Sequence, residues 1–264
     1  MKDKEENMSF WQHLDVLRGV LWRSIAATCI LAVAAFFLKD LLFALLFAPA
    51  QSDFVVYRGM CRLAEMTGWS SLCPSDFEAL FINTELASQF MTHLEVSLWA
   101  GVFLASPYII YLLYGFVAPA LYENEKRHSA ALIGSCVLLF MAGVLLNYFV
   151  IFPFSFRFLS TYQVRPEVVN QIALSSYMST FLLLSLMLGI MFELPVLAYA
   201  LAKLGILTPA MLCSYRKHAF VFICIVAAVI TPTGDAVTLM LVTMPVYLLY
   251  ELSISVVKRV TARK

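Results

Sequence analysis

The sequence places one carboxylate inside a long apolar run. Glu193 lies in the segment Met191–Pro195, and the run from Ile172 to Ala202 holds no other charged residue. A run of this length can span a bilayer, where an ionised side chain costs several kcal/mol unless it is paired or hydrated. Glu193 is therefore a candidate functional residue. It could titrate in a proton relay, or it could offer a polar contact to a peptide or helix within the membrane.

Small residues accompany this acid on one helix face. Ser185, Gly189 and Glu193 recur at a spacing of four, which places them on the same side of a helix. Small residues at that spacing let another helix, or a chain in transit, approach closely. Pro195 cannot donate to the carbonyl of Met191, so we expect a kink beside the acid. The face either opens on a wet cavity or packs on a neighbouring helix that satisfies a protonated Glu193.

Two other polar residues lie in or at the end of apolar runs. Asn147 follows Gly143 by four residues, and the pattern favours a hydrogen bond between helices over a place in the same cavity as Glu193. Glu251 ends an uncharged stretch near the expected cytoplasmic face. It can reach headgroup water there, so its burial costs less than that of Glu193.

A second chemistry is suggested by the cytoplasmic loop Phe116–Arg127. Glu123 and Glu125 each offer a carboxylate that can bind a guanidinium group through two hydrogen bonds, and the ring of Phe116 can stack on such a group. The competing interpretation is a charged loop that is simply solvated. The N-terminal stretch Phe10–Arg18 predicts an amphipathic helix at the interface, in which Asp15 and Arg18 are close enough to pair with each other.

The composition decides which elements must position these groups. The chain has 264 residues, of which 62% are hydrophobic and 13% charged. Soluble domains are about 25% charged, so this is a polytopic, all-α integral membrane protein. A formal net charge of +1 gives no bulk electrostatic case for binding nucleic acid. No cluster of Cys and His predicts a metal site, and we expect no cofactor.

The spans and their orientation follow from the apolar runs. Placing both termini in the cytoplasm puts 13 of the 18 basic residues in or beside cytoplasmic segments, so the positive-inside rule favours that orientation. The chain is expected to form one six-helix domain over residues 1–264. The six predicted spans are Val20–Leu38, Val96–Val117, Ala130–Phe152, Ser176–Ala202, Tyr215–Ile230 and Ala236–Val257.

The last two spans and the first outer loop depart from the usual pattern. The fifth span has 16 residues, and the uncharged part of the sixth has 15, so both fall short of a bilayer core of about 30 Å. This predicts a locally thinned membrane unless the boundaries are misplaced. The first outer loop, residues 39–93, is long. It contains Cys61 and Cys73, for which a disulfide and two free thiols are both open.

Six short motifs together resemble the TatC family, the multi-spanning core subunit of the twin-arginine protein translocase. The resemblance rests on the order of these motifs, on the six-span layout and on the short final spans. The residues of the motifs include Leu17, Arg18, Pro49, Pro119, Asp235 and Glu251. The motifs are HLDVLR at His13–Arg18, FAP at Phe47–Pro49, FVAPALYENEKR at Phe116–Arg127, FELPV at Phe192–Val196, TPTGD at Thr231–Asp235 and MPVYLLYE at Met244–Glu251.

The resemblance implies a receptor and scaffold in the bacterial cytoplasmic (inner) membrane, not an enzyme. Members bind the paired arginines of signal peptides on folded precursors. They also recruit small single-span subunits and associate with further copies, and transport is driven by the proton gradient. The arginine-binding acid of the family falls on Glu125, with Phe116 as its aromatic neighbour. The second acid of the family falls on Val16, which leaves Asp15, one position earlier, or Glu123 as candidates.

Two functions of different class are therefore weighed. The first is a signal-peptide receptor that uses Phe116, Glu125 and either Asp15 or Glu123, with Glu193 as a contact for a signal hairpin or a partner helix. The alternative is a proton-coupled small-solute transporter with Glu193 as the titrating group. Transporters often have repeated halves with broken helices in both, whereas only the fourth span here carries a kink and an acid. A membrane enzyme is less favoured, since no nucleophile–base constellation is present.

Overall fold

The computed structural model is almost entirely helical. It describes residues 10–68, 79–121, 126–165, 167, 170–231 and 235–262, with side chains for all of these except 10, 12, 13, 117–121 and 126–131. The elements are α1 (Phe10–Phe37), α2 (Lys39–Phe47), the 3₁₀ turn η1 (Ala48–Ala50), α3 (Val55–Thr67), β1 (Leu80–Ile82), α4 (Ser88–Leu121), α5 (Lys126–Leu146), the π-helical segment η3 (Asn147–Ile151), α6 (Phe152–Thr161), β2 (Gln171–Ala173), α7 (Leu174–Met191), α8 (Leu194–Lys203), α9 (Pro209–Ser214), α10 (Arg216–Ile230) and α11 (Ala236–Thr261).

Six helical segments of the described chain are long and apolar enough to cross a membrane, which agrees with the number predicted. They are Leu14–Phe37, Lys39–Thr67, Ser88–Phe116, Leu132–Thr161, Leu174–Lys203 and Ala236–Thr261. Five of them overlap predicted spans. The predicted fifth span is α10, whose 15 residues rise only about 22 Å, so it falls below the length of the other candidates.

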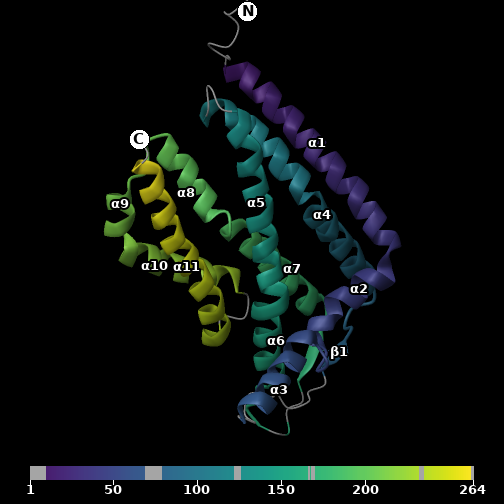
Figure 1. Ribbon diagram of the computed structural model, residues 1–264. Helices are drawn as coiled ribbons and strands as arrows, with labels where there is room; N and C mark the ends of the chain where they lie inside the picture. Colours follow the sequence, from purple (N-terminus) through teal and green to yellow (C-terminus); the bar gives the residue numbers. More distant parts are fainter. Residues whose placement is uncertain are drawn as a thin grey trace, which may run out of the picture.

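The segment Lys39–Thr67 enters this set by length and composition, but it is not one continuous helix. Residues 51–54 lie between η1 and α3 and are not helical. The long outer loop predicted over residues 39–93 is therefore mostly structured, as α2, η1, α3, β1 and the start of α4. In Figure 1, α2 and α3 lie across the end of the molecule that is opposite the two termini.

The predicted short sixth helix is longer than expected. Helix α11 has 26 residues and continues to Thr261, because the helix carries on through Glu251 and into the basic last turn with Lys258 and Arg259. Charged residues end an apolar run without ending a helix, and these positions can reach the polar headgroup region. The uncharged part of the helix is short, as predicted, whereas the helix itself is not.

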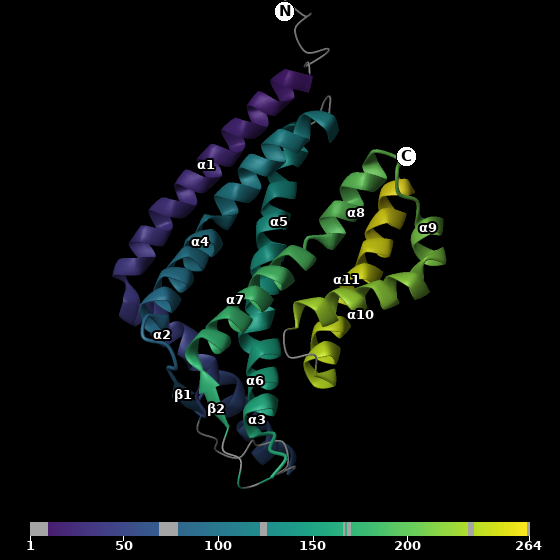
Figure 2. The ribbon, with the colours of Figure 1, turned by 180° about the vertical axis from the view of Figure 1, so that it is seen from behind.

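The long helices pack against one another in pairs. Helices α1 and α4 run side by side, as both views show (Figures 1 and 2), and a Cβ atom added at Gly101 of α4 would lie 2.6 Å from the carbonyl oxygen of Thr28 in α1. Helix α5 packs on α7, and α8 packs on α11. Without a Cβ atom, Gly101 lets α1 and α4 approach at a distance that van der Waals packing in a bilayer favours.

The end opposite the termini is closed by hydrogen bonds from tyrosines and by aromatic packing. The hydroxyl of Tyr57 in α3 donates to the carbonyl oxygen of Pro153 in α6, and that of Tyr177 in α7 donates to the carbonyl oxygen of Leu46 in α2, each at 2.7 Å. Strands β1 and β2 pair in parallel beside this cluster (Figure 2), and Phe81 of β1 packs edge-on against Tyr177. These long-range contacts hold α2, α3, α6 and α7 together as one cap.

Candidate functional site

Two of the predicted recognition residues, Phe116 and Asp15, belong to the last part of α4 and the first part of α1, which lie together at one end of the molecule (Figures 1 and 2). Phe116 is half-buried near the end of α4, and Asp15 is exposed in the first part of α1, which packs along α4. Val16 is also exposed, as is Arg18, whereas Leu17 is half-buried. Glu123 and Glu125 lie outside the described residues, so their predicted roles stay predictions.

The helix that carries Glu193 is interrupted at the acid. Helix α7 ends at Met191, and α8 begins at Leu194 with Pro195 in its first turn, where a missing N–H costs nothing. Glu193 itself occupies the residue before α8, with helical backbone angles. The sequence thus places a kink and a carboxylate at the same point, because proline prevents α7 from continuing with regular hydrogen bonds.

Around the carboxyl group of Glu193 the polar contacts are incomplete. The residue is half-buried, and its Oε1 is buried with no hydrogen-bond partner among the described residues. A hydrogen bond links the carboxyl group to the thiol of Cys136 in α5. A thiol is a weak donor, so Glu193 keeps acceptor capacity for another donor. Cys136 falls within the predicted third span, and nothing in its spacing along the sequence pairs it with residue 193.

Helices α5 and α7 contact each other along a seam of small and polar residues. A Cβ atom at Gly143 would lie 2.5 Å from the carbonyl oxygen of Leu188, and one at Gly189 would lie 2.7 Å from the ring of Phe140. Asn147 is fully buried and donates from Nδ2 to Oγ of Ser185 at 2.8 Å. The hydrogen bond between helices that the sequence predicted for Asn147 is therefore present.

This seam corrects one expectation. Ser185 and Gly189 were predicted to contact a signal hairpin or a partner helix, but both are buried against α5. Their small side chains accommodate a helix of the same chain. Pro195 is buried as well, so Glu193 is the half-exposed member of the predicted set.

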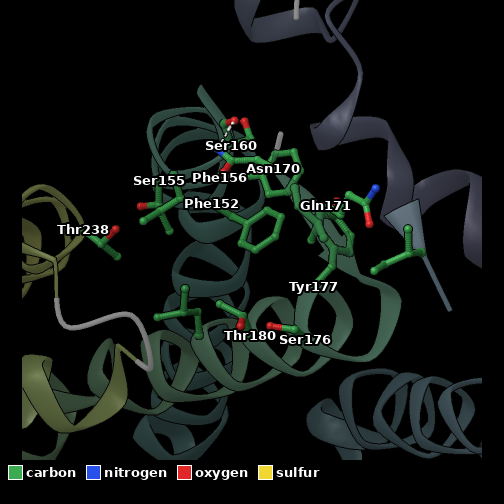
Figure 3. A pocket seen from close by; sticks show the side chains of 14 residues that line it. Phe152, Ser155, Phe156, Ser160, Asn170, Gln171, Ser176, Tyr177, Thr180 and Thr238 are labelled. Atoms are coloured by element: carbon green, nitrogen blue, oxygen red, sulfur yellow. Dashed lines mark hydrogen bonds between the residues drawn. The ribbon is translucent and has the colours of Figure 1, made fainter. Parts of the chain in front are cut away.

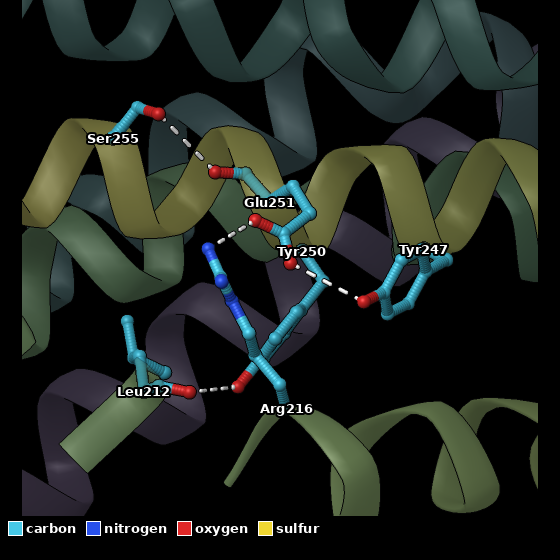
Figure 4. A network of polar contacts seen from close by, with 6 residues as sticks. All are labelled: Leu212, Arg216, Tyr247, Tyr250, Glu251 and Ser255. Atoms are coloured by element: carbon cyan, nitrogen blue, oxygen red, sulfur yellow. Dashed lines mark hydrogen bonds and ion pairs between the residues drawn. The ribbon is translucent and has the colours of Figure 1, made fainter. Parts of the chain in front are cut away.

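The other membrane-associated acid, Glu251 in α11, lies in a complete network (Figure 4). Its Oε2 accepts a hydrogen bond at 2.8 Å from Nη2 of Arg216, the first residue of α10, and its Oε1 accepts one from the hydroxyl of Tyr247 at 3.3 Å. The neighbouring Tyr250 donates to the carbonyl oxygen of Leu212 in α9 at 2.7 Å. These contacts tie α9, α10 and α11 together at one end.

Comparison with known proteins decides the family. The model of the family "Sec-independent protein translocase protein (TatC)" matches residues 12–245. The chain belongs to the TatC family. A TatC of Blattabacterium sp. is 33% identical and one of Azotobacter chroococcum is 32% identical; the aligned regions cover 100% and 99% of this chain and 100% and 94% of those proteins. A crystal structure of the twin-arginine translocase receptor TatC matches with a TM-score of 0.75 at 32% identity, over 94% of this chain and 99% of that one.

The family defines the class of function. This TatC-family chain is a multi-pass inner-membrane component of the Sec-independent protein translocase, a transport protein and not an enzyme. A translocase of this kind moves proteins. The alternative function, a small-solute transporter in which Glu193 titrates, therefore gives way to protein transport. The resemblance on which the sequence analysis relied is confirmed.

Several motif positions of this TatC-family chain have structural roles. Asp235 begins α11, and its Oδ1 accepts a hydrogen bond from the backbone N–H of Thr238 at 2.7 Å, which is a helix N-cap. Pro49 is buried in η1. Pro119 lies in the last turn of α4, where its side chain is not described.

The cysteines divide into two groups. Cys61 in α3 is disulfide-bonded, which removes the alternative of a free thiol at this position, and Cys73, the other cysteine of the same loop, lies outside the described residues. Cys29, Cys136, Cys213 and Cys224 are free. Sequence reasoning also missed Arg216 as the partner of Glu251. Both lie on the expected cytoplasmic side of adjacent spans, and that placement was the available signal.

Proposed function

We propose that this chain is the receptor of its translocase and binds the paired arginines of signal peptides on folded precursors. The observation that supports the proposal is the position of Phe116 near the end of α4, alongside the α1 helix whose first turns carry Asp15. The related crystal structure is named as the twin-arginine translocase receptor. Orientation by the positive-inside rule puts this end of the molecule in the cytoplasm, where precursors are made.

The recognition chemistry is that of guanidinium groups. Glu125 would accept two parallel hydrogen bonds from one arginine, while the ring of Phe116 would stack on a guanidinium plane. Asp15, exposed on α1, or Glu123 would accept the second arginine. Lysine cannot replace arginine at such a site, because its ammonium group offers neither the planar fork nor the stacking surface.

Glu193 would act after the arginines are bound, when a signal hairpin or a partner helix enters the membrane. Its half-buried carboxyl group has one oxygen without a partner among the described residues, inside the fourth predicted span, which suits a polar contact with a signal hairpin or with a helix of a small single-span subunit. The short α10 would thin the membrane near this point and reduce the distance that a polar segment must cross. The proton gradient would drive transport by a complex that contains several copies of this chain and its partner subunits.

Photo-crosslinking in inverted membrane vesicles tests the receptor role. A photoreactive residue at Phe116 or Glu125 is expected to crosslink to a twin-arginine precursor, and replacing both arginines with lysines should reduce the crosslink at least tenfold. A photoreactive residue at Leu98, exposed on the same helix α4 but nearer its other end, is the control and should give no precursor crosslink. Equal crosslinks to both precursors, or none to either, would refute the proposal.

A second measurement assigns the second acid. The variants Asp15→Asn and Glu123→Gln each remove a charge and keep most of the side-chain volume. We expect one of them to lower export of a twin-arginine precursor, and the crosslink from Phe116 to fall with it. Full export by both variants would show that neither acid completes the arginine site.

A further inference from the structure

Helix α2 is apolar on all sides beyond its first two residues. Of its nine residues, Lys39–Phe47, those after Asp40 are all apolar. Leu41, Ala44 and Leu45 are exposed. The other four belong to the hydrophobic core or pack against it: Leu42, Phe43, Leu46 and Phe47. A helix that faces water carries polar residues on its outward side, whereas one that is apolar all round lies in a protein core or in a membrane. The outward face of α2 therefore does not fit bulk water.

The inward side of α2 is covered by other parts of the chain. Leu46 is buried, and the rings of Phe47 and Tyr177 stack with their centroids 5.7 Å apart. Tyr177 also lines the cavity that Figure 3 shows between α6, β2 and α7. On the outward side, Leu41 and Leu45 are 69% and 56% exposed. The described chain thus leaves this face of α2 uncovered.

Two carbonyl groups at the end of α2 are hydrogen-bonded within the protein. The last four carbonyl groups of a helix have no partner inside that helix. In α2 the carbonyl oxygen of Leu45 accepts a hydrogen bond from the hydroxyl of Tyr148 at 3.0 Å, and that of Leu46 accepts one from the hydroxyl of Tyr177 at 2.7 Å. Backbone groups within a membrane must be paired inside the protein, because lipid chains offer no hydrogen bonds. These two carbonyls meet that requirement.

The outward face of α2 continues an apolar surface of α1. A single residue, Leu38, separates the two helices, and the N–H of Leu42 donates to the carbonyl oxygen of Leu38 at 3.0 Å across the bend. On α1 the side chains of Ile30, Val33 and Phe37 are exposed at spacings of three and four, as expected for the lipid-facing side of a span. Figures 1 and 2 show α2 directly at the end of α1. The apolar surface therefore passes from the first span onto α2.

Two other interpretations of this face fit less well. A stable protein interface buries roughly 800 Å² on each partner, which the three exposed side chains of α2 cannot supply alone. A face in contact with water carries charges, as α3 does at the same end of the molecule, where Arg58, Arg62 and Glu65 are exposed. The outward face of α2 carries no charge after Asp40.

From this continuity we infer that α2 lies in the outer leaflet of the membrane, with Leu41 and Leu45 against the acyl chains of phospholipids. The leaflet is the one opposite the termini, which the positive-inside rule makes the outer one. Lys39, exposed at the start of α2, lies at the level of the headgroups, where its long stem lets the ammonium group reach lipid phosphates. The cap is thereby held by lipid as well as by the spans. The inference concerns lipid alone and does not depend on the receptor role.

Crosslinking to lipid in the native membrane tests this placement. Cells that produce the full chain are grown with radioactive phosphate, which labels their phospholipids, and their membranes are irradiated before the chain is purified. A photoreactive residue at Leu41 leaves the hydrogen-bonded carbonyls of α2 in place. We expect it to take up at least fivefold more label on irradiation than a photoreactive residue at Glu65, which is exposed on α3 at the same end.

A matched pair of variants tests the apolar contact itself. Leu45→Glu should lower the label taken up at position 41 at least threefold, because a carboxylate among acyl chains is costly and draws α2 toward water. Leu63→Glu is the control and should leave the label unchanged, since Leu63 has the same exposed fraction, 56%, but lies on α3. A monodisperse protein after solubilisation reports that each variant is folded. If Leu45→Glu does not fold, the comparison of Leu41 with Glu65 decides alone.

Several results would overturn the inference. Equal label at Leu41 and Glu65, or no label at Leu41, would show that α2 does not lie among lipid chains. A crosslink from Leu41 mainly to a second copy of this chain, or to another protein, would show that a protein covers this face. Label at position 41 that a folded Leu45→Glu variant does not lower would also overturn it.

Discussion

Glu193 and Glu251 are two carboxylates on membrane-crossing helices, and the protein treats them differently. Glu251 accepts hydrogen bonds from Arg216 and Tyr247 and joins α11 to α10. Glu193 has the thiol of Cys136 as a partner. Its Oε1 is buried and has no hydrogen-bond partner among the described residues. A carboxylate whose oxygens are both used acts as a structural tie. One with an unused oxygen has capacity for a ligand, and that capacity is what a functional role requires.

The surroundings of the two acids explain this difference. Glu251 is four turns into a continuous helix and faces the first residue of an adjacent one, so an arginine can reach it from outside the apolar layer. Glu193 lies in a break between α7 and α8, above a seam with α5 that is too close for long side chains. The close contact between α5 and α7 fixes the position of Glu193. It also limits which side chains can come near enough to form a hydrogen bond with its carboxyl group.

The largest expected effect comes from disturbing that seam. Gly143→Ala adds a Cβ atom 2.5 Å from a backbone oxygen of α7, so the helices must separate and carry Glu193 away from Cys136. We expect a loss of about 1–3 kcal/mol of stability, as for other overpacked sites. The measurement is the temperature at which the detergent-solubilised protein loses its monodisperse form.

Gly134→Ala is the matched control for this prediction. Gly134 lies on the same helix α5, but a Cβ atom there would meet nothing within 4 Å. Because alanine favours helix more than glycine does, the control should be neutral or slightly stabilising. If both variants lowered the melting temperature equally, the close seam would not be what positions Glu193.

A smaller effect is expected from the network of Glu251. The side chains of Arg216 and Glu251 are 46% and 33% exposed, so their ion pair should contribute on the order of 1 kcal/mol. A double-mutant cycle of Arg216→Gln and Glu251→Gln isolates this coupling, read from the melting temperatures of the four proteins. A coupling indistinguishable from zero would show that Arg216 does not hold Glu251 in place, and that the two carboxylates do not differ in this respect.

Much of the fold followed from the sequence because a bilayer permits few structures. Apolar length, proline position and the distribution of basic residues predicted six spans, the break beside Glu193 and the contact of Asn147 with another helix. Patterns in one chain do not reveal which helix fills a small-residue face, so Ser185 and Gly189 were assigned to an incoming helix when α5 of the same chain occupies them.

The other differences between the predicted and the observed fold also arise from contacts between residues that are distant in the sequence. The segment of α2, η1 and α3 was expected as a loop, because Pro49 and several charged residues interrupt its apolar runs and its order comes from distant contacts such as that of Tyr57 with Pro153. The hydrogen bond from Tyr177 to Leu46 joins residues 131 positions apart. No local pattern could have brought them together.

The smallest effect on stability is expected from Glu193→Gln, and it is the sharpest test of the comparison. Glutamine keeps the shape and the hydrogen-bonding capacity of the acid but cannot ionise, and among the described residues no cation forms an ion pair with Glu193 that the substitution would remove. The melting temperature should change little, in contrast to a measurable drop for Glu251→Gln. Export of a twin-arginine precursor should continue at a large fraction of the normal rate if Glu193 offers a polar contact. Abolished export at an unchanged melting temperature would show instead that Glu193 must ionise during transport.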